Sequence, residues 1–152
     1  MGASRDFVAT SSNTMTDGGT IDWAASSWTV TLWFNYHGDV GSTVFQTMVS
    51  AHSGDRHAPL FYAVNWNSNV NKLVSYLGNQ GLVGTTTLSP NTWYFAAASF
   101  DGGTGTGNQR LYLGTTSALA TEEANKSFNP GNDGQLGVLL GEYGTAGFYF
   151  DG

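Results

Sequence analysis

The most constraining feature of this sequence is an alternation of side-chain character over residues 28–36. A period of two is typical of a β-strand, because successive side chains of a strand point to opposite faces. One face of this strand would be apolar and the other mostly threonine and asparagine, so the strand requires a second layer against its apolar face. The apolar set is Trp28, Val30, Leu32, Phe34 and Tyr36, and the second set is Thr29, Thr31, Trp33 and Asn35.

Similar short apolar runs recur along the chain, with turn signals such as Asp17-Gly18-Gly19 and Ser89-Pro90-Asn91 between them. Residues 93–100 are apolar on both faces, which predicts a central strand covered on both sides and a core position for Trp93, like Trp28. Residues 117–126 alone resemble a helix, of one or two turns. The further predicted strands are residues 7–9, 43–49, 60–66, 73–77, 111–113, 136–140 and 148–150.

These strands predict one all-β domain over residues 1–152, an antiparallel β-sandwich or jelly roll. The chain is rich in glycine (21 residues), which suits tight turns, and only 11% of its residues are charged. Threonine, serine and asparagine would therefore fill most outward positions of the strands.

Charge and composition exclude several classes of function. The net charge is −6, from 5 Lys+Arg and 11 Asp+Glu, so no basic surface for nucleic acid is expected. The chain contains no cysteine, which excludes disulfides, zinc ribbons and thiol nucleophiles. We recognise no signal peptide and no apolar stretch near the roughly 20 residues of a membrane span. We therefore expect no membrane partner, and a virion or extracellular location.

Three segments together resemble the laminin-G-like jelly roll of the concanavalin A-like lectin/glucanase superfamily. Residues 26–34, Ser-Ser-Trp-Thr-Val-Thr-Leu-Trp-Phe, resemble a strand of that family, and Phe7-Val8-Ala9 fits its opening strand. Residues 89–102, ending in Ser99-Phe100-Asp101-Gly102, are similar to its "W-x-H-V-A-A-T-Y-D-G" motif and are followed by Leu111-Tyr112-Leu113-Gly114. The third segment runs from Leu139-Leu140-Gly141 to Phe148-Tyr149-Phe150-Asp151-Gly152. The resemblance implies a concanavalin A-like jelly roll.

The sequence departs from the family pattern at its end. In the family, a closing strand of the type "I-D-E-V-R-I-Y" follows, whereas this sequence ends at Gly152. The sandwich would then lack its last strand, and another chain would complete the open edge. The alternative is that the domain closes differently and nothing is missing.

Catalysis is not expected. Retaining glycoside hydrolysis needs two carboxylates about 5 Å apart, and the glucanases of the superfamily carry Glu-x-Asp-x-Glu for this purpose. Glu122 and Glu123 are adjacent in sequence, and Glu142 has no acidic residue two positions away. No Gly-x-Ser-x-Gly motif is present.

Calcium is the cofactor that deserves consideration, because domains of this kind often hold it at the rim of the sandwich. Calcium prefers six to eight oxygen ligands. Asp55 and Asp101, next to glycine or in a loop, are the candidate ligands, with Asp133 and Asp151 as further loop acids. The alternative is that Asp101-Gly102 is an ordinary hairpin turn, so our expectation is no cofactor unless calcium binds.

Carbohydrate binding needs aromatic rings on which a sugar stacks, with amides and hydroxyls nearby. Trp66 is followed by Asn67 and Asn69, and Tyr143 lies in a glycine-rich turn, so these four are the candidate ligand-binding residues. The alternative is a core role for Trp66. Trp33 faces away from the apolar stripe and is either exposed or covered by a second sheet.

We therefore expect a non-catalytic structural or adhesion module. The first hypothesis is a virion (phage) surface or decoration protein that assembles on a larger particle, with a homo-oligomer or a capsid protein as partner and contact to surface glycans. The second is a carbohydrate-binding module of a secreted protein. A glycoside hydrolase ranks last, for want of paired acids.

Overall fold

The computed structural model of the chain describes residues 15–16, 21–22, 27–38, 46–53, 56–57, 60–63, 69–77, 80–103, 105–128, 135–136 and 138–140. These residues form thirteen strands and no helix. In chain order the strands are β1 (Met15–Thr16), β2 (Ile21–Asp22), β3 (Trp28–Tyr36), β4 (Gln46–Ser53), β5 (Arg56–His57), β6 (Leu60–Ala63), β7 (Lys72–Leu77), β8 (Gln80–Thr87), β9 (Thr92–Phe100), β10 (Gln109–Thr115), β11 (Thr121–Lys126), β12 (Gln135–Leu136) and β13 (Val138–Leu140).

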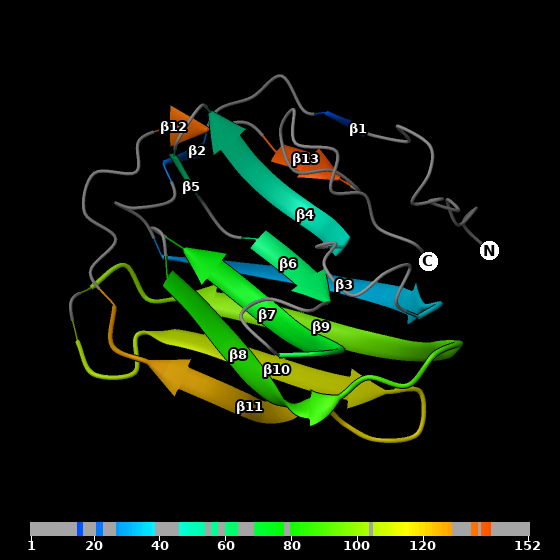
Figure 1. Ribbon diagram of the computed structural model, residues 1–152. Coiled ribbons are helices and arrows are strands. Elements are labelled where there is room, and N and C mark those ends of the chain that lie inside the picture. Colours follow the sequence, from blue (N-terminus) through cyan, green and yellow to red (C-terminus); the bar gives the residue numbers. More distant parts are fainter. Residues whose placement is uncertain are drawn as a thin grey trace.

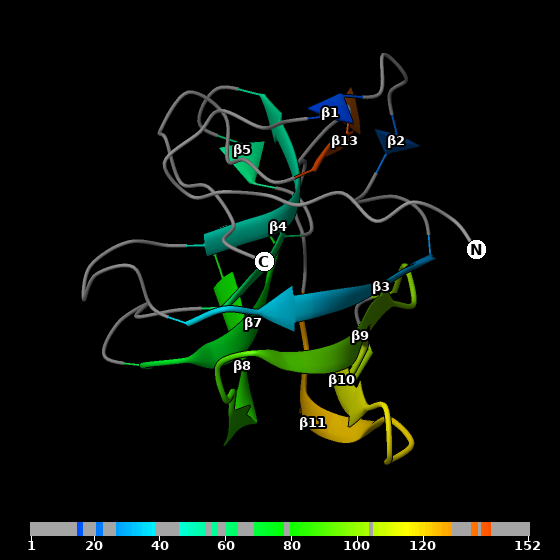
Figure 2. The same cartoon turned by 90° about the vertical axis from the view of Figure 1, so that its right-hand side faces the viewer.

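Two antiparallel sheets make up most of the structure. The larger has the order β1-β13-β4-β6-β7-β8 with β5 paired to β4, and the four-stranded sheet has the order β11-β10-β9-β3. A short third sheet pairs β12 with β2. In Figure 1, β7 and β8 lie in front of β9 and β10, and Figure 2 shows β3, β9, β10 and β11 in succession. The predicted all-β antiparallel sandwich is confirmed.

The alternation that predicted β3 also positions it. Phe34 and Tyr36 are buried, whereas Thr29, Thr31 and Trp33 are exposed. β3 pairs with β9 in unbroken register from Trp28↔Phe100 to Tyr36↔Thr92. The inner faces of the two sheets meet in one apolar cluster, formed mainly by Phe34, Tyr36, Met48, Val49, Leu73, Leu82, Leu88, Tyr94, Ala96, Ala98, Leu111 and Leu113.

The prediction that residues 93–100 are covered on both sides is wrong. β9 is central in its sheet, but only one of its faces is turned to the core, the face that carries Tyr94, Ala96 and Ala98. Trp93, on the other side, is 45% exposed rather than a core residue. No described strand packs on that face. Trp28 packs against the core, with its ring 6.0 Å from that of Phe100.

The helical expectation for residues 117–126 is also wrong, because residues 121–126 form β11. Helix-forming residues here take the extended conformation because β10 offers a ladder of hydrogen bonds, with a bulge between Leu111 and Tyr112. β8 was not predicted from the sequence. Gly81 and Gly84 of β8 have low strand propensity, and pairing with β7 stabilises the extended conformation instead.

Other predicted strands are confirmed with changed ends or lie outside the described residues. The strand predicted at 43–49 starts at Gln46 and continues to Ser53, and the strand predicted at 60–66 is observed over Leu60–Ala63. The predicted strands at 7–9 and 148–150 lie outside the described residues, as does the sheet closure near Gly152. The single domain over residues 1–152 stays a prediction.

Candidate functional site

The outer face of the four-stranded sheet carries large aromatic side chains in solvent. Trp33 of β3 is 52% exposed and Trp93 of β9 is 45% exposed. Phe95 and Tyr112 lie on the same face and are half-buried. We call Trp33, Trp93, Phe95 and Tyr112 the aromatic stripe. Exposed apolar patches of this kind mark binding surfaces more often than isolated exposed residues do.

Strand register brings the stripe together. Trp33 pairs with Phe95, which in turn pairs with Gly114, so these three residues form one row across β3, β9 and β10. The rings of Trp33 and Phe95 are 5.5 Å apart at an interplanar angle of 56°. This contact holds the indole ring without covering it, because Phe95 supports one side and solvent meets the other.

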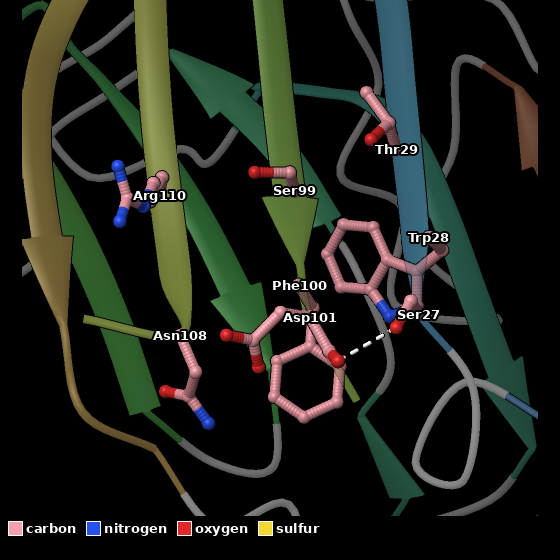
Figure 3. Close-up of a pocket in the computed structure, with 8 residues that line it drawn as sticks. All are labelled: Ser27, Trp28, Thr29, Ser99, Phe100, Asp101, Asn108 and Arg110. Atoms are coloured by element: carbon pink, nitrogen blue, oxygen red, sulfur yellow. Dashed lines mark hydrogen bonds between the residues drawn. The ribbon is translucent and has the colours of Figure 1, made fainter. Parts of the chain in front are cut away.

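Hydrophilic side chains continue the same face toward the opposite end of the strands. Thr29, Ser99 and Arg110 are paired in register across β3, β9 and β10, and we call them the polar row. They line a pocket of about 420 Å³ whose other lining residues are Ser27, Trp28, Phe100, Asp101 and Asn108. Figure 3 shows the polar row on three neighbouring strands, with the Ser27 hydroxyl donating to the carbonyl oxygen of Asp101 at 2.6 Å.

Arg110 and Glu122 form an ion pair at the polar end of this face. Arg110 Nη1 donates to Glu122 Oε2 at 3.3 Å, and Arg110 Nε donates to the carbonyl oxygen of Gly107 at 3.1 Å. Hydrogen bonding with Tyr112, and then the charges of Tyr112 and Glu122, raise the pKa of Arg110. The guanidinium is therefore always charged, and Glu122 compensates its charge.

Asn108, which lines the pocket at the β9–β10 turn, is buried and makes three hydrogen bonds. Its Oδ1 accepts from the amide of Phe128 at 2.7 Å, and its Nδ2 donates to the carbonyl oxygen of Phe128 at 2.6 Å and to that of Gly103. Asn108 therefore joins this turn to the chain after β11. The polar row therefore lies beside a turn that Asn108 joins to Phe128 by hydrogen bonds.

A known structure with the same fold is the crystal structure of a native heptameric SAP-like pentraxin from Limulus polyphemus. The two chains are 12% identical and superpose with a TM-score of 0.56. The alignment covers 92% of this chain and 64% of that chain, so this chain spans less than two thirds of the pentraxin's length. The fold is that of an antiparallel jelly-roll β-sandwich.

Comparison of the sequence with protein-family models and with curated proteins found no match. The jelly-roll fold that the concanavalin A-like resemblance implied is confirmed, as a fold. A laminin-G-like relationship in particular stays a prediction. Within the described part of the chain, no helix has the length and apolar character that crossing a membrane requires.

The ligand-binding role predicted from the sequence for Trp66, Asn67, Asn69 and Tyr143 stays a prediction. Trp66, Asn67 and Tyr143 lie outside the described residues. Asn69 is half-buried just before β7, in the larger sheet. The exposed tryptophans that the structure describes are Trp33 and Trp93.

The calcium prediction rested on Asp55 and Asp101. Asp55 lies outside the described residues, and Asp101 is exposed at the end of β9, where its Oδ1 accepts from the amide of Gly103 at 3.0 Å. This is the hairpin-turn role that was the alternative for Asp101. Among the described residues, no three acidic, histidine or cysteine side chains gather into a metal-binding group. Calcium binding stays a prediction.

The two described glutamates serve different sides of β11. Glu122 pairs with Arg110 on the outer face, whereas Glu123 accepts hydrogen bonds from β8. Glu122 and Glu123 therefore do not face a common substrate position as a hydrolytic pair does. Glu142 lies outside the described residues.

A parity signal in the sequence could have located the aromatic stripe. Trp33 has the same parity as Thr29, Thr31 and Asn35, so it belongs to the hydrophilic face of β3. Trp93 has the same parity as Ser99 within β9. Joining the two tryptophans on one surface requires the β3–β9 register, which the sequence pattern does not contain.

Proposed function

We propose that this chain is a non-catalytic adhesion module that binds glycans through the outer face of its four-stranded sheet. The observation that carries the proposal is the exposure of Trp33 and Trp93 on one face. Sugar rings have apolar faces that stack on aromatic side chains, and their hydroxyls hydrogen-bond to nearby polar groups. The polar row supplies such groups on the same face. The lectin-like fold supports this reading as an analogy of fold.

The test is binding of the protein to a glycan array, followed by titration of bound glycans with the Trp33→Ala variant. We expect the variant to fold normally, because Trp33 is 52% exposed, and to bind about tenfold more weakly, or ~1.4 kcal/mol. Val70→Ala is the matched control, because Val70 is 53% exposed but lies next to β7 of the larger sheet. If Trp33→Ala bound glycans with unchanged affinity, the outer face would not be the binding site.

A second proposed function is assembly on a larger particle, such as decoration of a virion. This proposal is favoured by the heptameric assembly of the structurally similar pentraxin. The sandwich would then provide a surface on which copies of the chain associate. A carbohydrate-binding module of a secreted protein uses the same outer face and differs only in its setting.

The mass of the native protein in solution tests the assembly proposal. Light scattering at several concentrations should give a discrete oligomer if the chain assembles. A monomer at all concentrations would contradict self-assembly and leave glycan binding as the sole function proposed.

A further inference from the structure

The outer face of the four-stranded sheet is long in the direction of β9. Side chains on this face recur at every second residue, and each pair of residues advances the strand by about 7 Å. From Trp93 to Ser99 the face therefore extends about 20 Å. Register defines four successive rows, Asn35–Trp93, Trp33–Phe95–Gly114, Thr31–Ala97–Tyr112 and Thr29–Ser99–Arg110.

The chemistry of these rows changes along the strand. The first two rows are dominated by indole and phenyl rings, and the last row presents two hydroxyls and a guanidinium beside the pocket. A small ligand bound at one end of the face would contact either the aromatic rings or the polar groups, but not both. A ligand that uses the whole face must be extended and must combine apolar faces with hydroxyl groups at regular intervals.

The charge of the face restricts this ligand further. Arg110 and Glu122 neutralise each other, and the exposed carboxylate of Asp101 adds a negative charge beside the pocket. The remaining rows carry no charged side chain. A polyanion would gain no attraction here and would meet a chain of net charge −6. A neutral ligand fits this charge pattern.

We infer that the outer face binds a neutral, extended oligosaccharide of about four sugar units aligned with β9. The inference rests on the glycan-binding function proposed above. One end of the sugar chain stacks on Trp93 and Trp33, and the other reaches Ser99, Thr29 and Arg110. Tyr112 contributes the ring next to the polar row.

The experiment is calorimetric titration of the intact chain with cello-oligosaccharides and chito-oligosaccharides of increasing length. We expect the affinity to rise with each unit until about four units and then to level off, since longer chains extend beyond the face. Trp93→Ala and Ser99→Ala alter opposite ends of the face. Each should weaken binding of the long oligosaccharides, Trp93→Ala by about tenfold, whereas a disaccharide should respond to one variant and not to the other.

Two controls accompany the series. Val70→Ala, on the larger sheet, should bind every length as the unaltered protein does. Oligogalacturonides of matched length test charge, and we expect them to bind more weakly than the neutral chains.

Several outcomes would overturn the inference. If one sugar unit binds as tightly as four, the site is local, although the glycan-binding function stands. Tighter binding of oligogalacturonides would contradict the neutral ligand. Failure of both neutral series to bind also overturns the inference, and the glycan array then decides separately whether the proposed function survives. A fall in solution mass with Trp93→Ala would show that a second copy covers this face.

Discussion

At the scale of single residues, the carboxylate of Glu123 accepts four hydrogen bonds from β8. Its Oε2 accepts from the amides of Thr85 and Thr86 at 2.9 and 2.7 Å and from the Thr85 hydroxyl at 2.8 Å. Its Oε1 accepts from the Thr86 hydroxyl at 2.8 Å. Gly84 of β8 lies beside this carboxylate, since a Cβ there would be in ordinary contact with Oε2 at 3.5 Å. Glu123 thus joins β11 to β8, one strand from each sheet.

The protonation state of Glu123 should couple this contact to pH. Burial raises the pKa of the carboxyl, but the hydrogen bonds from Thr85 and Thr86 outweigh burial, and the net pKa is lower than the usual 4.5. The ionised form is therefore preferred in the folded state. Its stabilisation is complete above the unfolded pKa, near pH 4.5, and is lost as the pH falls through the lower folded pKa.

Glu123→Gln should reduce the free energy of unfolding at pH 7 by about 1–2 kcal/mol. The variant should also lose less stability than the unaltered protein on acidification from pH 5 to pH 3, because it has no carboxylate to protonate at this position. Urea unfolding at a series of pH values measures both effects. Glu122→Gln is the neighbouring control, since its exposed ion pair contributes only about 0–1 kcal/mol. Parallel pH curves for Glu123→Gln and the unaltered protein would contradict the role given to Glu123.

At the scale of elements, the β10–β11 connection closes over Gly114 and borders the aromatic stripe. The Thr115 amide donates to the carbonyl oxygen of Ala118 at 3.0 Å, and the Thr115 hydroxyl accepts from the Ala118 amide at 3.1 Å. A Cβ on Gly114 would lie 2.8 Å from the nitrogen and 2.9 Å from the Cα of Ala120. Both atoms are backbone, so the connection could accept that Cβ only by moving.

Gly114→Ala should therefore destabilise the protein by about 1–3 kcal/mol through overpacking. It should also weaken glycan binding, because Gly114 shares a row with Trp33 and Phe95. Gly105→Ala is the matched control, because a Cβ at Gly105 would meet nothing within 4 Å. Urea unfolding of both variants measures the difference. Equal stability of the two would show that the connection yields without cost.

At the scale of the whole molecule, the two sheets meet through an apolar core that contains a polar bridge. Gln109 of β10 and Ser75 of β7 are both fully buried. Gln109 Nε2 donates to Ser75 Oγ at 3.4 Å, and Gln109 Oε1 has no hydrogen-bond partner among the described residues. A buried amide that is only partly satisfied costs free energy, so its effect on stability depends on keeping Ser75 as a partner.

Ser75→Ala should lower the free energy of unfolding by about 1–3 kcal/mol, since it leaves the Gln109 amide buried without this acceptor. The double variant Ser75→Ala/Gln109→Leu should recover to within about 1 kcal/mol of the unaltered protein, because both polar groups are then removed. A double-mutant cycle from urea unfolding measures the coupling. Additive losses in the double variant would show that the bridge does not couple the sheets.

The sequence by itself determined the class of fold and several of the extended segments. Residues 28–36 alternate except at Trp33, and alternation is a local property that a strand satisfies whatever lies against it. The same reasoning predicted strands that the structure confirms at β7, β9 and β10. The sequence also predicted a carbohydrate site at Trp66, which lies outside the described residues, so that prediction stays open.

Only the tertiary structure decided which faces are covered. Residues 93–100 are apolar on both sides, so the pattern does not distinguish the face of Trp93 from that of Tyr94; the second sheet covers one and leaves the other in solvent. Residues 121–126 have helical propensity, and pairing with β10 overrides it. Trp33, Trp93, Ser99 and Arg110 share a surface because of strand register, which joins residues far apart in sequence and depends on the packing of the whole sandwich.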